Sequence, residues 1–379
     1  MRTNKKSRFL FVVGTRPEVI KMAPLILQFR KEKKYKAILL NTQQQKELSD
    51  KTLKFFKLKS DINFNVMTAD QTLLDLQSKL LLKFQNLFSK VNNFDGVFVQ
   101  GDTMSAFCAG LSAFYHHIPV FHVEAGLRSY NLGEPFPEEA LRQMLTRISS
   151  LHFAPTQRAY DALLKENVDK KNIAITGNTV VDALGCIAKD AVAAARKNIA
   201  KEKIDIDKQN IVLITVHRRE NHGKRLIQIL NAIKVLANKF SGFVFVVPVH
   251  PNPNVKDKVY QSLSNIKNIK LIQPLNYPSL ALLAKNAHLI LTDSGGIQEE
   301  APTFGLPTLV ARYETERKEA IEAGVSKLVG ADEKKIILEA SKILAKSRAE
   351  TRIKVANPYG DGRASQKILK RVKAFFDDK

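Results

Sequence analysis

The chain has 379 residues, of which 44% are hydrophobic and 26% charged, a composition typical of a globular protein of two or three domains and one that excludes a fibrous or disordered chain. With only two cysteines, the sequence excludes a disulfide framework and a cysteine-rich zinc site. The net charge of +23 would suit a nucleic-acid surface, but the lysines are scattered without interleaved aromatic residues, so we expect a solvated basic surface and no nucleic-acid partner.

The first predicted element is a strand over Arg8–Val13. Its apolar part is too short for the core of a signal peptide, and the sequence Gly14-Thr15-Arg16-Pro17 ends it without a cleavage site of small residues. No apolar stretch of the sequence approaches the length needed to span a bilayer. We therefore expect a cytoplasmic protein with no membrane insertion.

Short apolar strands alternate with amphipathic helices through the first half of the chain. The predicted strands are Arg8–Val13, Ala37–Leu40, Val97–Gln100, Val120–Val123 and Leu151–Phe153. The predicted helices are Pro17–Lys31, Gln44–Phe56, Thr72–Ser89, Ser105–His116, Glu138–Ser149 and Gln157–Glu166. This alternation predicts a parallel sheet with helices on both faces.

The alternation restarts after Gly177, where we place a domain boundary. The strands predicted in this half are Ile211–Thr215, Phe243–Val247, Ile269–Ile272, Leu289–Leu291 and Thr308–Val310. The helices include Asp182–Ala200, Lys224–Phe240, Pro278–Asn286 and the C-terminal Arg363–Phe376. The predicted fold class is α/β, with two Rossmann-like doubly wound parallel-sheet domains over residues 1–176 and 177–362. Ligands of such sheets bind beyond the carboxyl ends of the strands.

Two glycines, Gly295 and Gly296, follow one of these strands and precede a predicted helix. A lone pair of glycines is more often an ordinary turn. Here Ser294 precedes the pair and Glu299-Glu300 follows in the first helical turn, which favours a nucleotide site. Glycines permit close approach of the backbone, the N–H groups at a helix start attract an anion, and a carboxylate can bind ribose hydroxyls.

A second strand-to-helix turn, Gly14–Glu18, contains Arg16, whose guanidinium can bind a phosphate through two parallel hydrogen bonds. Lys21 lies about one helical turn further along. The alternative is a solvated first turn, and it is a more serious alternative for Lys21 than for Arg16.

Three carboxylates of the first half, Asp102, Glu124 and Glu138, follow strand ends or open a helix. Each alone would be a helix cap or an exposed charge. If they converge on one cleft, each would raise the pKa of the others, which suits proton transfer. His217, just past a strand of the second half, would face them, with an ordinary surface histidine as the alternative. The sequence contains no GxGxxG turn, Walker A loop, serine nucleophile elbow or HExxH motif, so we expect no metal and no cofactor.

Motifs in order along nearly the whole chain resemble those of the non-hydrolysing UDP-N-acetylglucosamine 2-epimerases of bacteria and archaea. In the first half these are GTRPEVIKMAP from Gly14, VQGDT from Val99, HVEAGLRS from His122, PFPEE from Pro135, LHFAPT from Leu151 and TGNTVVDAL from Thr176. In the second half they are HRREN from His217, PVHPNPNV from Pro248, LTDSGGIQEEAP from Leu291, TER from Thr315, EAG from Glu322 and NPYGDG from Asn357.

The resemblance implies a GT-B-like fold with the active site in the interdomain cleft, a homodimer, and no metal or redox cofactor. It also implies that the C-terminal helix, residues 363–379, packs back on the first domain. It places Asp102, Glu124, Glu138 and His217 in the catalytic centre. It assigns the UDP-sugar to Arg16, Lys21, His250, Ser294, Gly295, Gly296, Glu300 and Arg317, with Leu275 and Leu280 in the segment that contacts uracil.

The implied reaction is reversible epimerisation at C2 between UDP-N-acetylglucosamine and UDP-N-acetylmannosamine. UDP would be eliminated and added back through a 2-acetamidoglucal, and the product would supply cell-surface polysaccharide synthesis. A hydrolysing epimerase, or an epimerase of a related N-acetylated UDP-sugar, would share the fold, although the Gly14–Glu18 turn is more similar to the non-hydrolysing branch. A GT-B glycosyltransferase is a more remote alternative.

Many bacterial members of this family are activated by a second UDP-N-acetylglucosamine molecule. The candidate residues for such a site here are Gln44, Gln45, Gln71 and Leu141. Gln45 stands where those members have histidine, Asp70 stands where some have arginine, and Leu141 replaces an asparagine. Neutral drift is the alternative, but together these departures predict weaker activation or a different preferred N-acetylated UDP-sugar.

Overall fold

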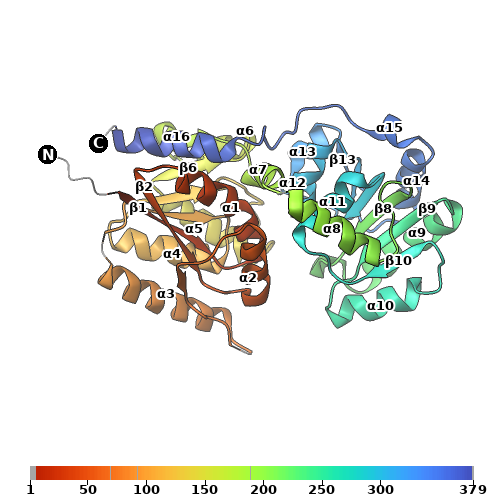
Figure 1. The fold of residues 1–379 in the computed structure, drawn as a ribbon, viewed down its shortest axis with the longest axis horizontal. Coiled ribbons are helices and arrows are strands. Elements are labelled where there is room, and N and C mark those ends of the chain that lie inside the picture. The colour runs from red at the N-terminus through yellow and green to blue at the C-terminus, as the bar shows by residue number, and fades with distance from the viewer. Residues whose placement is uncertain (1–5, 69, 92, 188, 378–379) are drawn as a thin grey trace. The chain divides into compact units, whose positions relative to one another are not determined.

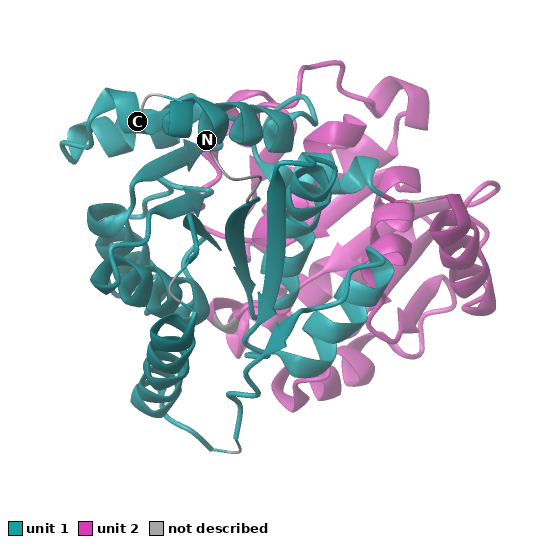
Figure 2. Ribbon diagram, turned by 60° about the vertical axis from the view of Figure 1, so that its left-hand side comes forward, with its two compact units in different colours: residues 1–186, 359–379 teal, residues 187–358 magenta. Residues whose placement is uncertain are grey.

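The computed structural model describes residues 6–377 apart from 69, 92 and 188, and the chain forms two compact units (Figures 1 and 2). Unit 1 comprises residues 1–186 and 359–379, and unit 2 comprises residues 187–358. Each unit contains one parallel sheet with helices packed against it. The predicted class of two doubly wound parallel-sheet α/β domains is therefore confirmed.

The sheet of unit 1 has seven strands in the order β3-β2-β1-β4-β5-β6-β7. Their bounds are β1 Ser7–Val13, β2 Tyr35–Asn41, β3 Ile62–Asn63, β4 Gly96–Gln100, β5 Val120–Val123, β6 Leu151–Ala154 and β7 Ile173–Ile175. All neighbouring strands are parallel. The central strands are apolar on both faces, as in residues 9–13 of β1, because helices cover both sides of the sheet.

The helices of unit 1 form two layers around this sheet (Figure 1). They are α1 Arg16–Arg30, α2 Lys46–Phe55, α3 Leu73–Lys90, α4 Met104–Tyr115, α5 Glu138–Ile148, α6 Gln157–Lys165, α7 Thr179–Gly185 and the C-terminal α16 Ala364–Asp377. α16 packs against α1 and α7. Its Phe376 ring lies edge-on to Phe9 with centroids 5.7 Å apart, and Asp182 of α7 accepts hydrogen bonds from the N–H groups of Ala364 and Ser365 at its start.

The expected single helix over Asp182–Ala200 is wrong. The structure has two helices, α7 ending at Gly185 and α8 over Lys189–Lys201. Glycine disfavours helix interiors by roughly 1 kcal/mol, and the buried face of α7, including Val180 and Ala183, belongs to unit 1. Unit 1 therefore extends beyond the boundary expected at Gly177.

The sheet of unit 2 has six parallel strands in the order β10-β9-β8-β11-β12-β13. The strands are β8 Asn210–Thr215, β9 Phe243–Pro248, β10 Ile269–Ile272, β11 Leu289–Thr292, β12 Thr308–Val310 and β13 Ser326–Leu328. The helices are α8, α9 Lys224–Lys239, α10 Pro253–Leu263, α11 Tyr277–Asn286, α12 Gly295–Glu300, α13 Lys318–Glu322, α14 Glu333–Leu344 and α15 Arg348–Thr351. Along the described part of the chain, no helix combines the length and apolar character that crossing a membrane requires.

Each sheet has one point at which the strand order reverses, between β1 and β4 in unit 1 and between β8 and β11 in unit 2. Such a switch point is where open α/β sheets bind ligands. The segments that follow these strands contain Arg16 and Asp102 in unit 1, and His217 and Gly295 in unit 2. The fold therefore places Arg16, Asp102, His217 and Gly295 beyond the carboxyl ends of the central strands of the two sheets.

Candidate active site

The turn between β1 and α1 is closely packed. A Cβ atom on Gly14 would lie 2.2 Å from Thr42 Oγ1 and 2.5 Å from Ser105 Oγ, so only glycine fits there. Buried Glu18 accepts hydrogen bonds from the N–H of Gly14 at 3.1 Å and of Thr15 at 2.8 Å. This arrangement presents the next residue, Arg16, at the start of α1.

Glu18 also connects this turn to the loop after β4, because its Oε1 accepts a hydrogen bond from the Thr103 hydroxyl at 2.7 Å. Burial raises the pKa of Glu18 to about 7, although these hydrogen bonds oppose the shift. Glu18 was not among the site residues predicted from the sequence. The sequence feature that points to this residue is a capping box, in which a Thr is followed three residues later by Glu at the start of a helix.

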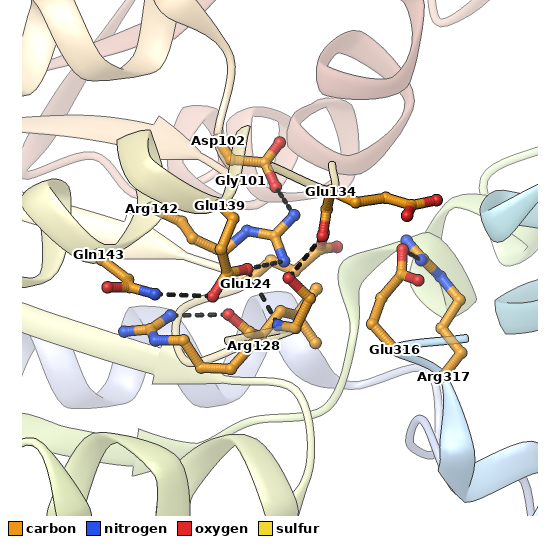
Figure 3. A network of polar contacts seen from close by, with 12 residues as sticks. Gly101, Asp102, Glu124, Arg128, Glu134, Glu139, Arg142, Gln143, Glu316 and Arg317 are labelled. Carbon is orange, nitrogen blue, oxygen red and sulfur yellow. Dashed lines mark hydrogen bonds and ion pairs between the residues drawn. The ribbon is translucent and has the colours of Figure 1, made fainter. Parts of the chain in front are cut away.

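Asp102 follows β4 and forms an ion pair with Arg142 of α5 (Figure 3). Arg142 is buried and also donates to Glu139 at 3.2 Å. Glu139 is fully buried and accepts the backbone N–H groups of Ser129 and Tyr130, both at 3.0 Å. Arg142 was not selected from the sequence, and it connects Asp102 to the helix that begins at the half-buried predicted residue Glu138.

Glu124 follows β5, the strand next to β4, so it lies at the same edge of the sheet as Asp102. Its backbone has a φ of 64°, in the left-handed region. Its carboxylate forms an ion pair with Lys21 and accepts a hydrogen bond from Asn178 Nδ2 at 3.0 Å. Lys21, which the resemblance assigned to UDP, thus lies against a predicted catalytic carboxylate. Asp102 and Glu124 thus each form an ion pair, with Arg142 and Lys21 respectively.

In unit 2, the segment after β8 is held by the fully buried Asp293. This carboxylate accepts the backbone N–H groups of His217 at 3.0 Å and Arg218 at 2.8 Å, and the side chain of Asn221 at 3.0 Å. The His217 ring stacks on His250, with centroids 5.2 Å apart and an interplanar angle of 10°. Two predicted residues are therefore in direct contact.

The glycine turn of unit 2 opens α12 directly, with Ser294 as the N-cap and Gly295 as the first helical residue. A Cβ on Gly295 would lie 2.5 Å from Arg317 Cζ, so the guanidinium lies against the turn. Arg317 donates to buried Glu299 at 2.8 Å and forms an ion pair with Glu316.

Charge is concentrated around this turn. Although burial opposes the shift, Arg317 and Arg312 hold the pKa of Glu316 below its usual range. Glu300, which the resemblance assigned to UDP binding, is buried in the same short helix as Gly296. A helix start with adjacent guanidinium groups is suited to a diphosphate.

The remaining predicted residues are distributed differently. Leu275 and Leu280 are half-buried and pack against the apolar core of unit 2. Gln44 accepts a hydrogen bond from Ser105 at 2.7 Å, and Gln45 accepts the backbone N–H of Arg16 at 3.1 Å, so both contact the β1–α1 region.

Gln71 instead accepts hydrogen bonds from Thr68 and Lys79, and Leu141 is buried in the apolar core of unit 1. Within the described residues, no group of three or more His, Cys, Asp or Glu side chains is arranged to hold a metal ion.

A family model described as UDP-N-acetylglucosamine 2-epimerase matches residues 27–373. A UDP-N-acetylglucosamine 2-epimerase of Salmonella borreze is 43% identical over 369 residues, which cover 96% of this chain and 97% of that protein.

Solved structures agree with this match. The UDP-GlcNAc 2-epimerase of Neisseria meningitidis, bound to UDP-GlcNAc, has a TM-score of 0.90 and 40% identity, over 97% of this chain and 100% of that one. The Methanocaldococcus jannaschii enzyme, in complex with UDP-GlcNAc and UDP, has a TM-score of 0.82 and 32% identity, over 97% and 99% of the two chains. Since sequence and fold match over nearly the full length of these proteins, the chain belongs to the UDP-N-acetylglucosamine 2-epimerase family of isomerases.

Proposed function

We propose that this protein interconverts UDP-N-acetylglucosamine and UDP-N-acetylmannosamine by a non-hydrolysing route. The observation that carries the proposal is the 43% identity to a UDP-N-acetylglucosamine 2-epimerase over 96% of the chain. We place the reaction in the cytoplasm, as a supply step for cell-surface polysaccharide synthesis, since a nucleotide sugar is an activated donor for glycan assembly.

The chemical difficulty of the reaction is the C2 proton, which has no adjacent carbonyl group to acidify it. Departure of UDP from C1 builds positive charge on the ring, and this charge acidifies the C2–H bond. The C1–O bond breaks, a carboxylate takes the proton, and a 2-acetamidoglucal forms beside UDP. Return of a proton to C2 on the opposite face, with addition of UDP to C1, gives the other epimer.

Proton transfer on two faces needs two acid–base groups. Asp102 and Glu124 follow adjacent strands and form ion pairs with Arg142 and Lys21. We assign the two proton transfers to the set Asp102, Glu124 and Glu138. The ionised carboxylates would also stabilise positive charge at C1 and C2.

We assign the stabilisation of the departing diphosphate to cationic side chains and to backbone N–H groups at helix starts. Arg317 lies against Gly295 at the start of α12, and Arg16 occupies the start of α1. With His217, these groups would stabilise the charge that develops on UDP. Glu300 and the segment with Leu275 and Leu280 are assigned to the ribose and uracil.

The direct test is product analysis after incubation with UDP-N-acetylglucosamine alone. The proposal predicts UDP-N-acetylmannosamine with no free sugar. Free N-acetylmannosamine with UDP would establish a hydrolysing epimerase instead. Turnover only with an added acceptor would establish a glycosyltransferase, and preference for another N-acetylated UDP-sugar would identify a related epimerase.

We also propose a homodimer. Its support is the apolar surface of α3, where Leu74 is 74% and Leu82 is 65% exposed, and of the adjacent α4, where Phe114 is 48% exposed. Large apolar side chains that stay exposed on neighbouring helices are candidates for burial in a subunit interface. Light scattering should give twice the mass of one chain, and Leu82→Glu should lower it.

A further inference from the structure

Asn178 connects a predicted catalytic carboxylate to the cap of a helix. It precedes α7, and its Oδ1 accepts the N–H of Val180 at 3.0 Å. Its Nδ2 donates to Glu124 Oε2 at 3.0 Å, and its backbone N–H donates to the Tyr359 carbonyl at 2.7 Å. The residue is 3% exposed. Each polar group of Asn178 named here is thus engaged inside unit 1.

The helix cap determines which way the amide points. Because Oδ1 is bound by the N–H of Val180, Nδ2 must be the atom directed at Glu124. Asn, Asp and Ser cap helices about equally well. Of these three, only Asn offers one atom as the cap and a second atom as a fixed donor. The helix cap would be satisfied by any of these three residues at position 178. The additional contact with Glu124 requires an N–H donor, and among the three only Asn has one.

Glu124 is held from three directions. Its backbone lies in the left-handed region at the end of β5, which a non-glycine residue adopts where its surroundings hold it. Lys21 of α1 and Asn178 before α7 both donate to the same oxygen, Oε2. Among the contacts of the described residues, Oε2 is therefore the anchored oxygen, and Oε1 is the one assigned to exchange a proton.

We propose that Asn178 is a positioning residue for Glu124: its cap-oriented amide fixes Oε2, so that Oε1 meets the C2 proton of the sugar. This inference rests on the proposed function, in which Glu124 carries one of the proton transfers. Asn178 itself would not contact the sugar, so its loss should lower kcat more than it changes KM.

The test uses Asn178→Asp and Asn178→Ser in the full-length protein, since both substitutions retain a capping atom. Asp332 caps α14 through the N–H of Lys335 at 3.0 Å, so Asp332→Asn and Asp332→Ser are matched cap controls. Exchange at C2 of UDP-N-acetylglucosamine in deuterated water, kcat and KM are measured across pH, at a temperature where circular dichroism shows each variant folded.

We expect kcat to fall roughly 10–100-fold in both Asn178 variants, the scale of a misplaced reacting group, with a smaller change in KM. In Asn178→Asp, the acid limb of the kcat/KM profile should move to higher pH, because two adjacent carboxylates disfavour each other's ionised form. The Asp332 controls should keep wild-type kinetics. In a Glu124→Gln background, Asn178→Ser should cost little more, since its target is already lost.

Two results separate the possible failures. Absence of C2 exchange in the wild-type protein would refute the proposed function and, with it, this inference. If the wild-type protein exchanges the C2 proton but kcat is unchanged in both Asn178 variants, the positioning role alone is overturned. The same conclusion follows if Asn178→Ser lowers kcat by the same factor in the Glu124→Gln background as in the wild type.

Discussion

At the scale of single residues, Asp102 and Glu124 form ion pairs with Arg142 and Lys21. Asp102→Asn, Glu124→Gln, Glu138→Gln and His217→Asn should each lower kcat roughly a hundredfold or more, the scale of a lost acid–base group. UDP affinity, measured by calorimetry, should survive in the three carboxylate variants. Glu339→Gln is the control, since Glu339 forms ion pairs with Lys327 and Lys342 outside the site. Near-normal turnover in any one variant would remove that residue from the catalytic set.

Buried histidines should make the protein sensitive to acid. His122 donates from Nε2 to the Gly101 carbonyl at 2.8 Å, and burial lowers its pKa to about 4. The unfolded chain binds protons near the ordinary pKa of about 6.5, so unfolding is favoured as the pH falls from there toward 4. Each such histidine costs up to about 1.4 kcal/mol per pH unit. His152, with a pKa lowered to about 3 by burial, acts in the same direction.

The measurement is the urea midpoint between pH 7.5 and 4.5. His122→Gln, whose amide can replace the Nε2 donor, should flatten the decline. The exposed His117 provides the control, and His117→Asn should leave the slope unchanged. An identical slope in His122→Gln and the wild type would contradict this account.

At the scale of elements, Asp182 of α7 caps the first turn of α16. Asp182 accepts the N–H groups of Ala364 at 3.1 Å and Ser365 at 2.8 Å. Asp182→Ala should lower the free energy of unfolding by about 1–2 kcal/mol, the upper range for a lost cap, because the N–H groups would stay buried. Asp332→Ala at the exposed cap of α14 should cost less. Equal losses would show that burial adds nothing to the Asp182 cap.

The prediction of altered regulation concerns the start of α1. Gln45 accepts the N–H of Arg16 at the first turn of the helix. We predict weaker activation by UDP-N-acetylglucosamine than in a relative with histidine at this position, measured as the rate from UDP-N-acetylmannosamine with and without traces of the gluco epimer. Leu141→Asn should also destabilise unit 1, because Leu141 is buried in apolar surroundings. A strict requirement for the gluco epimer that is unchanged in Gln45→His and Leu141→Asn would show that these departures are silent.

Sequence pattern predicted elements well where apolar runs were long. β1, β8 and their following helices have the strongest signals, because central strands are buried on both faces. The short strands β3, β7 and β13 were not predicted, because each has at most one fully buried residue, whereas all three residues of the equally short β12 are buried. The break between α7 and α8 was missed although Gly185 ends α7. The two helices pack in different units, α7 on α1 and α8 on α11.

The same limit applies to the site. Asp102 and Glu124 could be chosen because they follow strands at one sheet edge. Their partners Arg142 and Asn178 come from elements distant in sequence, and only tertiary contacts identify them. Lys21 was assigned to UDP through the resemblance, and its ion pair with Glu124 is a further contact that only the tertiary structure identifies.

For the whole molecule, the central claim is that C2 of a UDP-N-acetylhexosamine exchanges its proton while UDP is released and added back. The measurement is proton NMR of the full-length protein with UDP-N-acetylglucosamine in deuterated water, with EDTA and without added NAD. The account predicts deuterium at C2 of both epimers. Retention of the original C2 hydrogen in the epimerised product would contradict it.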